Sequence, residues 1–394
     1  MHRARSCPIK DRCLITLLCL ISIVVLPAQG SATNGEVLWS WKVPAGTKFA
    51  GYRAYDLGVE HNRFAGVRRW GNEQVLVYAV GGQASLPTRN AENSRAYLLH
   101  IYVLNSRTAA LETSLELAVE SASTELQVVR GGIVVRSGRS LTFLSKQFKQ
   151  VGPGFVVPLL IAPQAWGVEG EMGDWLKLLV SPDGGKFVLS CEHGRAEKYY
   201  LFNGDSFTLE RTMTMEEPIR AESFGDSTLL FRGSDDTNSV HAAHFTQADV
   251  QVSSLIYSAE HKSCATAVYI DARQFANVCN GVSIVNLAGK ETVVETLAKG
   301  EVQSGRGILS ADGTHLAVAR RRFKGGSSFF DISPRITGFV VRVFELEPPR
   351  FVVQLPVDPA PKEICDYVFT DNDTLVVMAD DKVTAYNLSS DHGN

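Results

Sequence analysis

Three short motifs contain residue types that bind metals or perform catalysis. His241 and His244 lie three residues apart in a predicted β-strand, where such residues point to opposite faces and cannot share a metal ion. Asp371-Asn372-Asp373 begins like a calcium loop but lacks the glycine and the distal glutamate that complete one. We therefore expect no metal site and interpret the second motif as a turn.

Two serines, Ser181 and Ser310, lie in turn motifs without the Gly-x-Ser-x-Gly context of a hydrolase nucleophile. The sequence also contains no Ser-x-x-Lys motif, no phosphate-binding glycine loop and no His-Glu-x-x-His motif. We therefore assign no catalytic residue and no cofactor. The alternative of an enzyme whose catalytic residues come from distant segments stays open.

Cys264 and Cys279 flank a predicted hairpin with a two-residue turn at Asp271-Ala272. In that register they are opposite each other on adjacent strands, with Cβ atoms roughly 4.5–5.5 Å apart, so we consider a disulfide between them. We expect Cys191 and Cys365 to be buried thiols.

The most basic segment of the sequence lies in a predicted long loop at 321–337. Arginine beside exposed phenylalanine suits a carboxylate-bearing partner, and a soluble loop without a partner is the alternative. The candidate binding residues are Arg320, Arg321, Arg322, Lys324, Phe329, Phe330 and Arg335, together with Trp166 from another predicted loop at 162–174.

The elements that position these residues are short strands separated by Gly, Asp, Asn and Ser turns. The clearest hairpins are 179–189 and 308–318, each with a Ser-x-Asp-Gly turn. Equivalent turns at 72, 132, 183, 226, 271, 312 and 372 define seven units of 41 to 60 residues, as expected for four-stranded blades.

The seventh unit lacks a fourth strand, and residues 35–44 form a strand-like segment with no blade before it. Pairing the two would close a ring and remove an open sheet edge. The predicted fold is an all-β, seven-bladed β-propeller over residues 35–394, with six or eight blades as alternatives.

The Ser-Pro-Asp-Gly hairpin and this ring closure resemble the WD40-like β-propellers of exported proteins, of the YVTN and quinoprotein-like kinds. The Gly-His and Trp-Asp dipeptides of standard WD40 blades are absent. Residues 35–39 resemble one quinoprotein repeat, which implies a quinone-dependent dehydrogenase as a third, weaker hypothesis.

Residues 1–30 resemble a secretory signal peptide, with a basic start, an apolar run at 13–26 and small residues before a cut after Gly30 or Ala32. The alternative is an uncleaved anchor, although this run is shorter than the roughly 20 residues of a spanning helix. Cleavage would change the net charge from −3 to about −6, which argues against nucleic-acid binding. We expect an exported protein, periplasmic or secreted, with no transmembrane segment after cleavage.

Three long predicted loops, 45–63, 81–95 and 321–337, converge on one face over blades six, seven and one, which we name the top face. Long loops on a rigid scaffold commonly carry binding residues. The sequence thus predicts a monomeric, non-catalytic binding or scaffold propeller whose ligand is a protein or an acidic polymer. The alternative is a hydrolase, lyase or oxidoreductase with a site in the central channel.

Overall fold

The computed structural model describes residues 35–44, 65–84, 96–121, 124–158, 176–193, 196–215, 219–233, 239–245, 250–252, 257–258, 266–279, 281–286, 288–324, 335–361 and 365–389. Within these ranges every α-helical or β-strand element is a strand. They contain no helix long and apolar enough to cross a membrane. The predicted signal segment 1–30 lies outside them.

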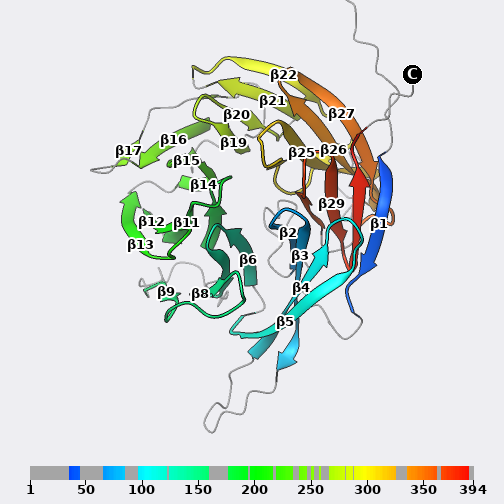
Figure 1. Ribbon diagram of the computed structural model, residues 1–394. Coiled ribbons are helices and arrows are strands. Elements are labelled where there is room, and N and C mark those ends of the chain that lie inside the picture. Colours follow the sequence, from blue (N-terminus) through cyan, green and yellow to red (C-terminus); the bar gives the residue numbers. More distant parts are fainter. Residues whose placement is uncertain are drawn as a thin grey trace, which may run out of the picture. The chain divides into compact units, whose positions relative to one another are not determined.

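The strands form seven antiparallel sheets arranged as the blades of a propeller (Figure 1). Blades one to three are β2 (Ala65–Trp70), β3 (Gln74–Ala84), β4 (Ala96–Asn105) and β5 (Leu111–Val119); β6 (Thr124–Val129), β7 (Gly132–Ser137), β8 (Ser140–Ser145) and β9 (Phe155–Val156); and β10 (Leu176–Val180), β11 (Lys186–His193), β12 (Ala196–Asn203) and β13 (Leu209–Met215).

Blades four and five are β14 (Ile219–Gly225), β15 (Thr228–Gly233), β16 (Ser239–Phe245), β17 (Val250–Val252) and β18 (Tyr257–Ser258); and β19 (Ala267–Asp271), β20 (Gln274–Asn277), β21 (Gly281–Asn286) and β22 (Glu291–Thr296). Blades six and seven are β23 (Glu301–Gln303), β24 (Ile308–Leu309), β25 (His315–Lys324), β26 (Arg335–Leu346) and β27 (Pro349–Pro356); and β28 (Cys365–Phe369), β29 (Thr374–Ala379) and β30 (Lys382–Asn387) with β1 (Glu36–Lys42).

The N-terminal strand closes the ring, as predicted. β1 pairs antiparallel with β30 and becomes the outermost strand of blade seven, so it lies beside the last blade in Figure 1. Trp39 of β1 is buried with residues of blades one and seven, and its Nε1 donates a hydrogen bond to the Ser106 carbonyl at 2.7 Å. The first and last strands of the ring therefore share one apolar core.

The Ser-x-Asp-Gly turns have the chemistry that the sequence predicts. The Ser181 hydroxyl donates to Asp183 Oδ1 at 2.7 Å and accepts from the Lys186 amide. Gly184 adopts φ +67°, a left-handed conformation that glycine permits without strain. Ser310 and Asp312 repeat the arrangement in blade six.

All seven innermost strands run in the same direction, because each blade is an antiparallel meander that starts on the same side. The top face is therefore the side where innermost strands begin and second strands end. The hairpins β3–β4 and β25–β26 have strands of 10 to 12 residues, and both lead to this face on either side of blade seven.

Two expectations about local structure are wrong. Residues 81–84 and 321–324 belong to β3 and β25 rather than to loops, because each strand continues pairing beyond its apolar stretch. The innermost strand of blade six is interrupted between β23 and β24, where residues 304–307 oppose only Val318 and Ala319 of β25. The sequence analysis did not anticipate this bulge.

Candidate functional site

The innermost strands line a central channel of about 760 Å³. Its wall carries more charged residues than the neighbouring apolar cores between blades. The charged lining residues are Arg68, Arg69, Glu125, Lys177, Glu222, Glu301, Arg306, Arg321 and Asp366. Glu125, Lys177, Glu301 and Asp366 are the first or second residues of innermost strands, so these four lie toward the top face.

Arg68 joins three blades at the channel wall. Its Nη1 is 2.5 Å from Asp366 Oδ2 of blade seven, and its Nε donates to the Leu126 carbonyl and the Gln127 side chain of blade two. Gly66 permits this approach, because a Cβ there would lie 2.3 Å from Asp366 Oδ2. Asp366 and Arg68 are therefore positioning groups that hold blades seven, one and two together.

Glu125 is the buried acid of blade two. Its Oε1 accepts from Gln127 at 2.8 Å, and its Oε2 lies 3.6 Å from Arg136 Nε. Burial alone would raise the pKa of this carboxyl, but Arg136, Arg306 and Gln127 outweigh that effect and lower it. Arg306 lies in the bulge of blade six, which is not a neighbour of blade two. The positive charge of Arg306 therefore acts on Glu125 from a distant blade of the ring.

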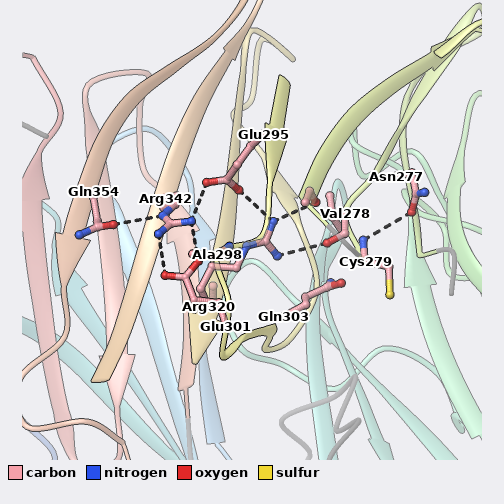
Figure 2. Close-up of polar contacts among 12 residues, drawn as sticks. Asn277, Val278, Cys279, Glu295, Ala298, Glu301, Gln303, Arg320, Arg342 and Gln354 are labelled. Atoms are coloured by element: carbon pink, nitrogen blue, oxygen red, sulfur yellow. Dashed lines mark hydrogen bonds and ion pairs between the residues drawn. The ribbon is translucent and has the colours of Figure 1, made fainter. Parts of the chain in front are cut away.

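A second network joins blades five and six (Figure 2). Arg342 of β26 donates to Glu295 Oε1 at 2.6 Å and to both oxygens of Glu301 at 2.8 and 3.0 Å. Arg322 Nε also donates to Glu301, at 2.8 Å. Arg320 donates to Glu295 and to the carbonyls of Val278 and Gly281, so the side chains of three arginines and two glutamates connect the two blades.

This network stabilises the ionised form of Glu301. Burial would raise its pKa, but the hydrogen bonds from Arg322 and Arg342 dominate and lower it. The Arg320 side chain is fully buried, and burial lowers its pKa despite the nearby Glu295. These contacts give the network a structural role at the boundary between blades five and six.

Arg321 lies on the other side of β25. Successive strand residues alternate between sheet faces, so Arg321 faces blade seven while Arg320 and Arg322 face blade five. Its guanidinium carbon is 5.9 Å from the centroid of the Phe339 ring, and it lines the channel with Phe323 and Cys365. Its Nε is buried without a hydrogen-bond partner, and no acid among the described residues pairs with it.

The predicted binding residues have separate outcomes. Arg320, Arg321 and Arg322 lie in a strand rather than a loop, and the buried Arg320 side chain bridges two blades. Their roles in binding stay predictions. Lys324 and Arg335 are paired residues of the two strands at the end of the β25–β26 hairpin. Phe329, Phe330 and Trp166 lie outside the described residues, so their roles remain predictions.

The predictions about the cysteines have different outcomes. Cys279 is disulfide-bonded, and Cys264, its predicted partner, lies outside the described residues. The hairpin register behind that prediction is wrong by one residue, since the turn is at 272–273 and Ala267 pairs with Asn277. Cys191 and Cys365 are thiols, half-buried rather than buried, and burial raises the pKa of the Cys365 thiol.

No group of three or more metal-binding side chains occurs within the described part of the chain. His241 and His244 lie in β16, as predicted, and contact different residues: His241 stacks on Phe231, and His244 Nδ1 is 2.9 Å from the Thr228 hydroxyl. The second motif, Asp371 to Asp373, forms a turn before β29.

The sequence analysis missed the buried ion pairs within and between the blades. Arg136 and Arg342 were the detectable members, because each interrupts an apolar run of its strand, a pattern that indicates a buried ion pair. Their partners Glu125, Glu295 and Glu301 are distant in sequence or lie on other strands. Identifying those partners requires knowing which residues of neighbouring strands are paired and how the blades pack.

No protein-family model matches the sequence, and no curated protein matches it either. Several solved structures are similar to the chain. The chain is similar to one in the "Crystal Structure of Mitotic Checkpoint Complex", with 11% identity and a TM-score of 0.53 over 99% of this chain and 98% of that one.

It also matches the WD40 domain of Toxoplasma gondii coronin, with 10% identity and a TM-score of 0.49 over 92% of this chain and 90% of that one. For BamB from Moraxella catarrhalis the identity is 12% and the TM-score 0.43, over 90% and 99% of the chains. At such identities a likeness concerns the fold alone: the chain has the seven-bladed fold of the WD40-like β-propellers.

Proposed function

We propose that the chain is a non-catalytic binding module that works outside the cytoplasm and holds an acidic protein on its top face, over blades six, seven and one. The observation that carries this proposal is the pair of long hairpins, β3–β4 and β25–β26, that lead to this face on either side of blade seven. WD40-type propellers commonly bind proteins in this way, with loops on a rigid ring.

The described contacts support a rigid scaffold. Besides the two networks, the Tyr269 hydroxyl of blade five donates to Asp226 of blade four at 3.0 Å, and the Ala319 amide of blade six donates to the Tyr367 hydroxyl of blade seven at 3.1 Å. A disulfide at Cys279 suits an oxidising compartment, which is compatible with export by the predicted signal at 1–30.

Crosslinked capture from the source's extracytoplasmic fraction tests the binding role. One variant replaces residues 325–334, and another residues 85–95, with a Gly-Ser linker of equal length. The matched control carries Arg107→Glu and Arg273→Glu, both in turns on the opposite face. We expect the control to capture the same protein as the wild type and both loop variants to lose it. Equal capture by all four proteins would overturn the top-face assignment.

Export has its own test. The intact mass of the protein recovered outside the cytoplasm should correspond to a chain that begins at Ser31 or Thr33. A chain that retains residues 1–30 in the cytoplasmic fraction would contradict the proposed location, whatever the capture experiment shows.

The channel favours one alternative, an enzyme with a central site, because acids line a cavity of about 760 Å³. However, Glu125 and Glu301 each contact an arginine, an arrangement that lowers their pKa and stabilises them as anions rather than as proton donors. Incubating the purified chain with small-molecule extracts would separate the two functions. Consumption of a compound by the wild type but not by a Glu222→Gln variant would favour the enzyme.

A further inference from the structure

Three consecutive arginines face two different blade boundaries. Arg320 and Arg322 are held by Glu295 and Glu301 at the boundary with blade five. Arg321, at the boundary with blade seven, contacts the Phe339 ring and has no ion pair with any described acid. Of the three, Arg321 is therefore the one whose charge is not paired with an acid among the described residues.

The surroundings of Arg321 form the start of a site. Val302, its neighbour across β23–β25, is 41% exposed, and Phe323 is half-buried on the same side of the hairpin. Both line the channel together with Cys365 of blade seven. The position thus combines one cation, an apolar rim and an opening toward the top face.

The geometry of the guanidinium and the apolar rim limit the ligand. Other cations and acids line the same cavity, and Glu301 and Asp366 are already paired with arginines, so charge alone does not select one anion over another. A carboxylate carries one charge and matches the planar guanidinium. Its methylene groups could pack on Val302 and Phe323.

We infer that Arg321 is the anion-binding residue of the top face and that it binds a carboxylate side chain of the protein partner. This inference rests on the proposed binding function for the identity of the partner. The recognition of a carboxylate by Arg321 is a separate property, and it can be measured without any partner.

The neighbouring Cys365 thiol provides the measurement. Iodoacetate and iodoacetamide alkylate a thiolate by the same substitution, in which sulfur displaces iodide, but only iodoacetate carries a carboxylate. The ratio of the two rates at Cys365 therefore reports carboxylate recognition, since any change in the pKa of the thiol affects both reagents equally. Peptide mass spectrometry gives the same ratio at Cys191 as an internal reference.

We expect the Arg321→Gln variant to lower the iodoacetate-to-iodoacetamide ratio at Cys365 about tenfold and to leave the ratio at Cys191 unchanged. Arg321→Lys should restore part of the ratio, because it retains the charge without the planar fork. The matched control is Arg69→Gln, which removes another channel-lining arginine and should leave the ratio at Cys365 unchanged.

An unchanged ratio at Cys365 in Arg321→Gln would overturn the inference. So would a wild-type ratio at Cys365 that is no higher than the ratio at Cys191, because Arg321 would then give the carboxylate reagent no advantage. Either result leaves the capture experiment valid, so failure of this inference is distinguishable from failure of the proposed function.

Discussion

The boundary between blades five and six differs from the boundary between blades six and seven, although β25 contributes arginines to both. At the first, Glu295 and Glu301 pair with Arg320, Arg322 and Arg342. At the second, Tyr367 links the blades through the Ala319 amide and the Arg306 carbonyl, and Arg321 has no acidic partner among the described residues. A run of like charges in a sequence therefore does not define one surface: in a strand its members can take opposite roles.

Removing an arginine from the paired boundary should have the largest effect. In Arg342→Met, Glu295 and Glu301 lose their shared partner while remaining largely buried. We expect the free energy of unfolding to fall by about 3–5 kcal/mol, measured by urea denaturation.

The matched control for that variant is Arg350→Met. Arg350 pairs with Glu345 at a mostly exposed position, so its loss should cost less than about 1 kcal/mol. Equal costs for the two variants would show that the boundary network contributes no more than a surface ion pair.

Acidification should weaken the same boundary by a smaller amount. The pKa of Glu301 in the folded chain lies below its ordinary value of 4.5, so its contribution is complete above that value and is lost as the pH falls through the folded pKa. We expect the wild type to lose about 1–2 kcal/mol more than Glu301→Gln between pH 7 and pH 3.

Urea denaturation at both pH values measures this difference. Glu345→Gln is the control, since Glu345 pairs with the mostly exposed Arg350. Its loss of stability on acidification should match that of the wild type. Parallel losses in wild type and Glu301→Gln would mean that Glu301 does not contribute to acid sensitivity.

The sequence was sufficient to predict the fold because its signals are local. Ser181, Asp183 and Gly184 determine a hairpin within a few residues, and their recurrence in blade six reveals the repeat. The closure by β1 followed from counting strands, since an unpaired strand at one end matched a missing strand at the other.

The channel wall could not be predicted in the same way, because its contacts depend on register. Arg68 contacts Asp366 almost 300 positions away, and no local pattern specifies that pair. The segment after Ala319 was interpreted as a loop because its charges hid the alternation of a strand. One residue of register decides whether Arg321 or Arg320 faces blade seven, so the placement of the binding arginine needed the paired strands.

Removing Arg321 should have the smallest effect on stability, and it tests the comparison most directly. Arg321→Met keeps an apolar stem over Phe339 and removes a cation whose pKa burial lowers. Since no acid among the described residues depends on it, we expect the free energy of unfolding to change by less than about 0.5 kcal/mol, or to rise. Urea denaturation beside Arg342→Met measures both arginines with the same substitution. A loss for Arg321→Met comparable to that for Arg342→Met would assign Arg321 to the scaffold and remove the distinction between the two boundaries. A negligible loss would show that Arg321 is not needed for folding, as expected for a binding residue.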